Sequence, residues 1–115
     1  MSDSQCPFCK IFASEIPAQE ITRTQDVLVF RDLNPQAPTH LLAIPGRHVA
    51  DLGEFVRSAE PAEVGALFTA ASRAGREASR SGYRIVVNEG PDAGQSVAHL
   101  HLHVLAGRSL RWPPG

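Results

Sequence analysis

The sequence lacks long apolar runs and an excess of either charge. Across 115 residues, 11 Lys and Arg stand against 12 Asp and Glu, so the formal net charge is −1. No apolar stretch approaches the roughly 18–20 residues of a membrane span, and no basic stripe indicates a surface for duplex nucleic acid. The polar N-terminus has no apolar segment typical of a secretory signal. We therefore expect one cytoplasmic domain over residues 1–115 that binds neither a membrane nor nucleic acid.

Cysteine is also scarce, because the only two, Cys6 and Cys9, form a single Cys-x-x-Cys unit. A structural disulfide is not expected in a reducing compartment. Three interpretations of the pair stay open: half of a zinc site that takes two more ligands from elsewhere, a redox pair, or two small buried hydrophobic residues. A redox pair normally opens a helix after a strand, and here no strand precedes it.

Histidine is present in an unusual pattern, since three of the five in the chain are His99, His101 and His103. A strand sends alternate side chains to opposite faces, so the spacing predicts three imidazoles on one face and an apolar face opposite. Such a row is interpreted as an exposed polar face, as a three-histidine metal site, or as a catalytic face that handles an anion.

The rest of the chain predicts an α+β fold, because strands precede and follow one long helix. We expect Gly82 to cap that helix in a left-handed conformation. The expected helices cover Pro7 to Ser14, a turn from His48 to Phe55, and Pro61 to Ser81. The expected strands cover Gln19 to Arg23, Asp26 to Asp32, His40 to Pro45, Tyr83 to Asn88, and Ala98 to Leu105.

The loop before the histidine row, residues 88–97, contains two glycines that let its backbone approach a ligand closely. Free backbone N–H groups in such a loop bind phosphate, and Ser96 adds a hydroxyl. A neutral imidazole is a good nucleophile when its other nitrogen is held as a donor. His101 has an imidazole on each side, so this geometry favours it as the nucleophile at a phosphorus centre. His40 is interpreted as a structural residue bonded to backbone.

The run from His99 to Leu105 resembles the signature of the histidine triad (HIT) superfamily of nucleotide hydrolases and transferases. Further segments resemble its Hint branch, the purine nucleoside phosphoramidases. They are residues 30–40, 83–90 (with Asn-Glu-Gly), 94–97 (with Gly-Gln-Ser) and 112–115 (Trp-Pro-Pro-Gly).

The resemblance implies a HIT-like five-stranded antiparallel sheet with one long helix and a short N-terminal helix. Two copies would join into a ten-stranded sheet as a homodimer. Residues 1–15 would form an N-terminal arm that carries the Cys pair. Residues 107–115 would form a C-terminal tail that brings Trp112 to the neighbouring subunit's site.

The resemblance also implies a reaction. His101 would attack the α-phosphorus of a nucleoside phosphoramidate or aminoacyl adenylate, and water would release the nucleoside monophosphate from nucleotidyl-histidine. A carbonyl near His99 would fix the tautomer of His101, and Ser96 would assist the leaving group. The other substrate-binding residues would be His103, Asn88, Gly94, Gln95 and Val97 around the phosphate, Asp32 at the ribose, Ile11, Phe30 and Leu33 at the purine base, and Trp112.

Related branches that carry the Cys pair hold a structural zinc, and the matching ligands here are Cys6, Cys9, His48 and His99. The implied reaction needs no catalytic metal. Alternative functions are a dinucleoside polyphosphate hydrolase or nucleotidyl transferase of the same superfamily, a metal-dependent hydrolase, and a nucleotide-binding interaction module.

Overall fold

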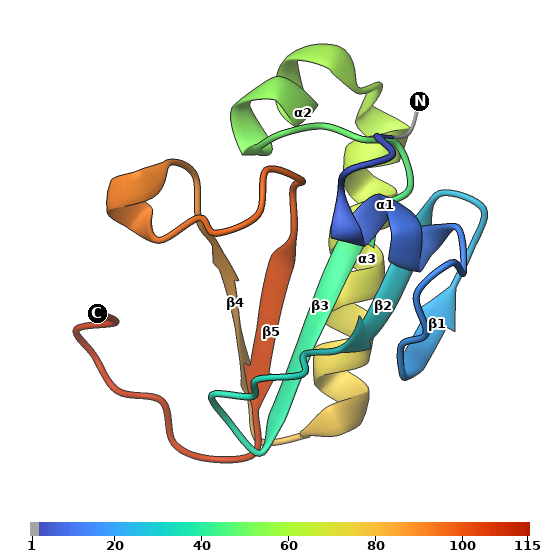
Figure 1. The fold of residues 1–115 in the computed structure, drawn as a ribbon. Helices are drawn as coiled ribbons and strands as arrows, with labels where there is room; N and C mark the ends of the chain where they lie inside the picture. Colours follow the sequence, from blue (N-terminus) through green and yellow to red (C-terminus); the bar gives the residue numbers. More distant parts are fainter. Residues whose placement is uncertain (1–2) are drawn as a thin grey trace.

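The structure, a computed structural model, describes residues 3–115. A single antiparallel sheet of five strands runs through it in the order β1-β2-β3-β5-β4 (Figure 1). The α+β class and the five-stranded sheet are confirmed. The strands are β1 (Glu20–Arg23), β2 (Val27–Arg31), β3 (Thr39–Pro45), β4 (Tyr83–Val87) and β5 (Leu102–Ala106).

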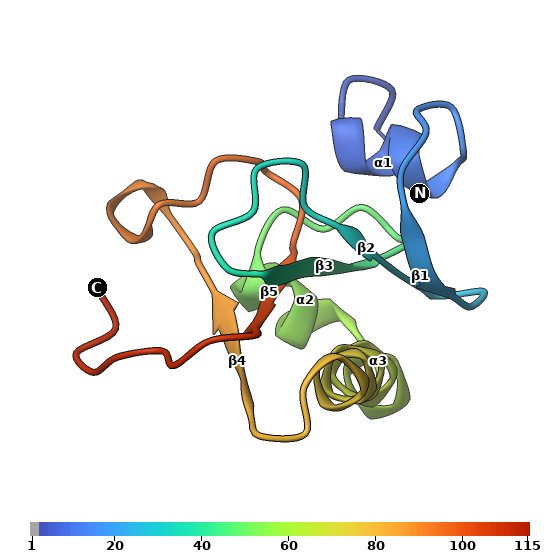
Figure 2. The same cartoon turned by 90° about the horizontal axis from the view of Figure 1, so that it is seen from below.

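Helices cover the two faces of this sheet unequally. The long helix α3 (Pro61–Ala78) lies across one face, and the short α1 (Pro7–Phe12) lies on the other face, as Figure 2 shows. The third helix, α2 (Leu52–Ser58), follows the end of β3 and is capped by the Asp51 carboxylate, which accepts from the Glu54 N–H. No helix within residues 3–115 combines the length and the apolar character of a membrane crossing.

Strand alternation divides the core into two layers. Val27 and Val29 of β2 pack with α3, whereas Leu28 and Phe30 of the same strand pack under α1. The expected apolar side of the histidine run is confirmed, because Leu100, Leu102 and Val104 belong to the α3 layer. The histidine side therefore faces the α1 layer.

The expected strand from Ala98 to Leu105 is wrong at its start, because β5 begins only at Leu102. His99 and His101 precede the strand, and the first ladder partners are Ala43 with Leu102. The reason is that the backbone at this point bonds elsewhere: the Leu100 N–H donates to the Val49 carbonyl at 2.8 Å, and the His99 carbonyl accepts from a side chain.

The expected helix boundaries also need correction. The turn expected from His48 to Phe55 starts only at Leu52, so His48 stands in a non-helical segment before the Asp51 cap. The helix α3 ends at Ala78 because Ser79 is extended (φ −155°, ψ 117°), and Gly82 at φ +143° therefore serves the turn into β4 rather than the helix cap. The loop 88–97 contains a short 3₁₀ turn, Pro91–Ala93, which the sequence did not predict.

Candidate functional site

A cavity of about 260 Å³ lies in the angle between α1 and the sheet. Asp32, Ser96, His101 and His103 supply most of its polar lining. The remaining lining is mostly apolar and comes from α1, β2, β3 and the segments beside them: Phe8, Ile11, Ile16, Pro17, Ala18, Phe30, Arg31, Leu33, Leu42 and Val97. The space therefore combines an apolar slot with a cluster of imidazoles.

His101 is held at this cavity with a defined tautomer. Its Nδ1 lies 2.8 Å from the His99 carbonyl oxygen, which only accepts, so Nδ1 carries the proton and Nε2 has a free electron pair. The ring of Phe8 packs edge-on against the imidazole, with centroids 5.1 Å apart. His101 is thus buried and oriented, with the Nε2 electron pair unoccupied by the His99 contact.

The tautomer of His103 is set through a second histidine. The Gln36 N–H donates to His40 Nδ1 at 3.0 Å, so a neutral His40 carries its proton on Nε2. This Nε2 lies 2.9 Å from His103 Nδ1 and 3.3 Å from Asp32 Oδ2. His103 therefore accepts at Nδ1 and keeps its own proton on Nε2, as a donor.

Burial keeps these rings neutral. Burial, with the neighbouring His101 and His40, lowers the pKa of His103 to about 4, although the Asp32 carboxylate opposes the shift. Burial likewise lowers the pKa of His40, again against the Asp32 carboxylate. Near neutral pH the two rings form a chain of neutral hydrogen bonds from the Gln36 amide to His103.

Sequence reasoning assigned His40 only a structural contact with backbone. The contact exists, but the other nitrogen of His40 reaches the histidine row. A usable signal was present, because alternation along β3 places His40 on the same face as Leu42 and Ile44, the α1 face.

The structure brings some predicted residues to the cavity and leaves others outside it. Gly94, Gln95, Asn88 and Trp112 are not among its lining residues. Gly94 adopts a left-handed conformation in the loop, at φ +87°, and the Gln95 side chain bonds to backbone groups. Trp112 is 81% exposed. It belongs to the tail that follows β5, and this tail runs out past β4, on the side away from α1 (Figure 1).

A second cluster joins the N-terminal arm to the segment before β5. Cys6, Cys9, His48 and His99 bring one donor atom each to within 4.8 Å of one another. His99 Nδ1 lies 3.3 Å from Cys6 Sγ, 3.5 Å from Cys9 Sγ and 3.2 Å from His48 Nδ1. The four residues named from the resemblance are thus adjacent, although they are distant in sequence.

The chemistry of this cluster fits a zinc ion. His99 Nε2 lies 3.0 Å from the Pro45 carbonyl oxygen, so the proton stays on Nε2 and Nδ1 presents its electron pair to the cluster. Tetrahedral zinc with N and S ligands requires donors roughly 3.3–3.8 Å apart, close to the distances here. Burial lowers the pKa of His99 to about 4 and raises that of Cys9, so without a cation both donors would be neutral.

Asp32, His40 and His103 also bring potential ligand atoms together. The Gln36 N–H argues against a metal there, because it occupies the Nδ1 pair of His40 and leaves a proton on the Nε2 that a metal would need. We interpret this trio as a hydrogen-bonded chain.

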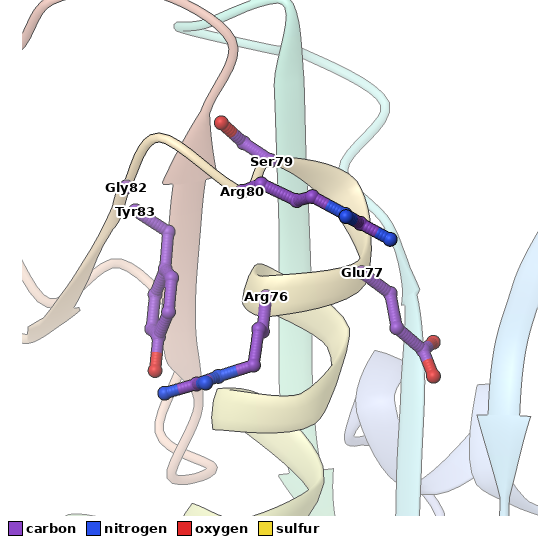
Figure 3. Close-up of a pocket in the computed structure, with 6 residues that line it drawn as sticks. All are labelled: Arg76, Glu77, Ser79, Arg80, Gly82 and Tyr83. Carbon is purple, nitrogen blue, oxygen red and sulfur yellow. The ribbon is translucent and has the colours of Figure 1, made fainter.

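Another hollow lies at the C-terminal end of α3, and Figure 3 shows the side chains that line it. Arg76 extends beside Tyr83, whereas Glu77 and Arg80 point to the other side of the helix. These groups do not converge on a common point, so the hollow lacks the geometry of a reaction site. It adjoins the free edge at β4.

Comparison with known proteins gives consistent matches. The profile of the HIT domain family matches residues 13–110. The chain is 43% identical to a "14 kDa zinc-binding protein" of Zea mays, over all of this chain and 91% of the relative. It is 42% identical to "Adenylylsulfatase HINT1" of Arabidopsis thaliana, over 99% of this chain and 79% of the relative.

Solved structures of histidine triad proteins also match this fold. A HIT family hydrolase from Legionella pneumophila superposes with a TM-score of 0.90 at 42% identity, covering 96% of this chain and 99% of the other. A histidine triad protein from Clostridium difficile gives 0.86 at 36% identity, covering 96% and 97%.

Proposed function

Because the chain belongs to the HIT domain family, we propose that it hydrolyses the P–N bond of purine nucleoside phosphoramidates or the acyl phosphate bond of aminoacyl adenylates. The observation that carries this proposal is the hydrogen bond from His101 Nδ1–H to the His99 carbonyl at the edge of a cavity that also contains Ser96 and His103.

In the first step, the electron pair on His101 Nε2 attacks the α-phosphorus, and the P–N bond breaks while the departing amine takes a proton from solvent through the Ser96 hydroxyl. The imidazole becomes positively charged, and the His99 carbonyl stabilises this charge through the Nδ1–H. His103 Nε2–H donates to a non-bridging phosphate oxygen, and the backbone at Val97, which lines the cavity, is a further contact. Asn88 and the backbone near Gly94 do not line the cavity, and their contacts with the phosphate are proposed from the family resemblance alone.

In the second step, water attacks the phosphorus and restores the free imidazole. Overall one water is consumed: its hydroxyl group stays on phosphorus in the nucleoside monophosphate, and its remaining proton goes to the amine. Ser96 assists departure of the amine. Asp32 accepts from the ribose hydroxyls, and the base occupies the apolar slot formed by Ile11, Phe30 and Leu33.

The Cys6, Cys9, His48 and His99 cluster is proposed to hold a structural zinc ion outside the reaction path. When bound, the ion supplies a cross-link between the N-terminal arm and the chain just before His101. Support comes from the convergent donors and the His99 tautomer. Activity that persists in chelator, in protein that stays folded, would separate this role from that of a catalytic metal.

We also propose a homodimer that pairs the β4 edge of two copies into a ten-stranded sheet. The other edge, β1, is irregular between Glu20 and Thr22 and carries the Glu20–Arg23 ion pair, features that discourage pairing. The β4 edge is regular and half-buried. In such a dimer the tail of one copy, with Trp112, would serve the site of the other.

Competing substrates test the assignment. Adenosine and guanosine phosphoramidates, adenylyl sulfate and a diadenosine polyphosphate are compared by kcat/KM with the same enzyme. Preference for the phosphoramidates supports the proposal. Preference for adenylyl sulfate, the substrate class named for the Arabidopsis relative, or for the diadenosine compound would replace it. Binding without turnover would favour an interaction module.

A further inference from the structure

Gln95 uses both ends of its side-chain amide on backbone. Its Oε1 accepts from the Gly90 N–H at 3.0 Å, while its Nε2 donates to the Ala50 carbonyl at 2.7 Å and to the Val97 carbonyl at 3.0 Å. The three groups belong to the start of the loop, its end, and the segment between β3 and α2. One side chain therefore connects three pieces of chain.

The loop needs such a connection because its own backbone is permissive. Gly90 and Gly94 adopt φ values of +90° and +87°, and nothing stands within 4 Å of where a Cβ would lie. Glycine loses more conformational freedom on ordering than other residues. Backbone bonds within the loop close only the turn from Gly90 to Gln95. Among residues 3–115, the other bonds that link the chain between β4 and β5 to the 46–53 segment come from Glu89 near the start of the loop and from His99 and Leu100 beyond its end. Gln95 is therefore the link from the second half of the loop to that segment.

Ser96 lies between Gln95 and Val97, the two residues that a hydrogen bond from the Gln95 side chain joins. The bond from Gln95 Nε2 to the Val97 carbonyl spans Ser96, whose hydroxyl makes no hydrogen bond within residues 3–115. Ser96 reaches the cavity, whereas Gln95 does not. The position of the Ser96 hydroxyl is therefore set by the backbone on which it stands, and Gln95 holds that backbone.

We propose that Gln95 is a positioning residue that acts through Ser96 on the leaving group, rather than a contact of the nucleotide. This inference rests on the proposed function, in which Ser96 assists the departing amine. An amine leaves with the electron pair of the P–N bond and must gain a proton, so a misplaced hydroxyl slows its departure. A nitrophenolate needs no proton to leave, so the same fault should hardly affect it.

The test compares two adenosine substrates, an alkylamine phosphoramidate and a 4-nitrophenyl phosphodiester, in five proteins: the wild type, two single variants, their double variant and a control. Gln95→Glu keeps the oxygen that accepts from the Gly90 N–H. It replaces the Nε2 donor by a second oxygen, which cannot donate to the Ala50 and Val97 carbonyls. We expect Gln95→Glu and Ser96→Ala each to lower kcat for the phosphoramidate about 10- to 100-fold, and for the nitrophenyl ester less than about threefold. The double variant should be no slower than Ser96→Ala, because both substitutions remove the same contribution, the assistance that the Ser96 hydroxyl gives to the leaving amine.

The matched control is Gln25→Glu, which makes the same change in the exposed turn between β1 and β2 and should keep wild-type kcat for both substrates. AMP affinity is measured in each protein. Equal losses on both substrates in Gln95→Glu, including losses caused by unfolding, would overturn the inference, as would multiplicative effects in the double variant or a selective loss of AMP affinity. Failure of the proposed function itself would show separately, as wild-type protein that cleaves neither substrate.

Discussion

At the scale of single residues, the backbone decides what each histidine can do. The His99 carbonyl frees Nε2 of His101, the Pro45 carbonyl turns Nδ1 of His99 to the cysteines, and the Gln36 N–H leaves His40 as a donor to His103. The alternate spacing predicted a shared face, and the resemblance predicted the His99 carbonyl contact. Alternation along β3 places His40 on the α1 face, but its partner His103 follows from the pairing of β3 with β5, which spacing within one segment does not reveal.

Protonation of these buried rings should destabilise the fold. The pKa of His103 is about 4 in the folded protein and about 6.5 in an unfolded chain, so the unfolded state binds more protons between these values. The stability contribution is fully present above pH 6.5 and is lost as the pH falls toward 4, by at most about 3 kcal/mol. Urea unfolding at pH 7 and pH 5 measures the part of this loss that falls in that interval, at most about 2 kcal/mol. The His103→Asn variant should lose less stability over that interval; an equal loss would argue against His103 as its source.

At the scale of elements, the cavity exists because α1 is fixed against the sheet. Phe12 of α1 packs over Gly46, where an added Cβ would lie 2.6 Å from Phe12 Cε2. The guanidinium of Arg23 in β1 lies over the same ring, 5.1 Å from its centroid. The apolar spacing of Phe8, Ile11 and Phe12 predicted this helix. Its docking place was not predictable, because it depends on one glycine after β3.

Gly46→Ala should therefore displace Phe12 and loosen α1. We expect a loss of about 1–3 kcal/mol in unfolding free energy, as for overpacking elsewhere, together with weaker AMP binding because Ile11 and Phe8 line the cavity. Gly65→Ala is the matched control. No atom stands within 4 Å of its added Cβ on α3, so it should raise stability by up to about 1 kcal/mol. Equal effects of the two substitutions would refute the role of the Gly46 contact.

At the scale of the whole molecule, the N-terminal arm, the segment after β3 and the chain before β5 meet at the Cys and His cluster. Sequence spacing left three interpretations of the Cys pair open, because His48 and His99 lie 39 and 90 residues beyond Cys9. The family resemblance named the right neighbours. The late start of β5 was not predicted, since it follows from the bonds that this junction makes.

Removal of the metal should lower the stability of the entire fold. Protein purified without chelator should contain one zinc per chain by elemental analysis, and chelator should lower its melting temperature. Cys9→Ser should lower zinc content and abolish most of the chelator effect, since the remaining donors no longer complete a tetrahedral set. Zinc below stoichiometric amounts, or a melting temperature that chelator leaves unchanged, would contradict the proposed metal site.

Light scattering tests the proposed assembly. Two copies paired at β4 should give twice the mass of one chain, and Val86→Pro should give monomers if its N–H side faces the second copy, because proline removes a ladder donor and blocks close pairing. A wild-type monomer over a range of concentrations would contradict the dimer.

Rapid-quench mass spectrometry of the intact protein tests the central claim most directly. After mixing with adenosine phosphoramidate, wild-type protein should carry one transient adenylyl group, mapped to His101, while His101→Asn should carry none and still bind AMP. An adenylyl group on a different residue, or full turnover by His101→Asn, would contradict covalent catalysis by His101.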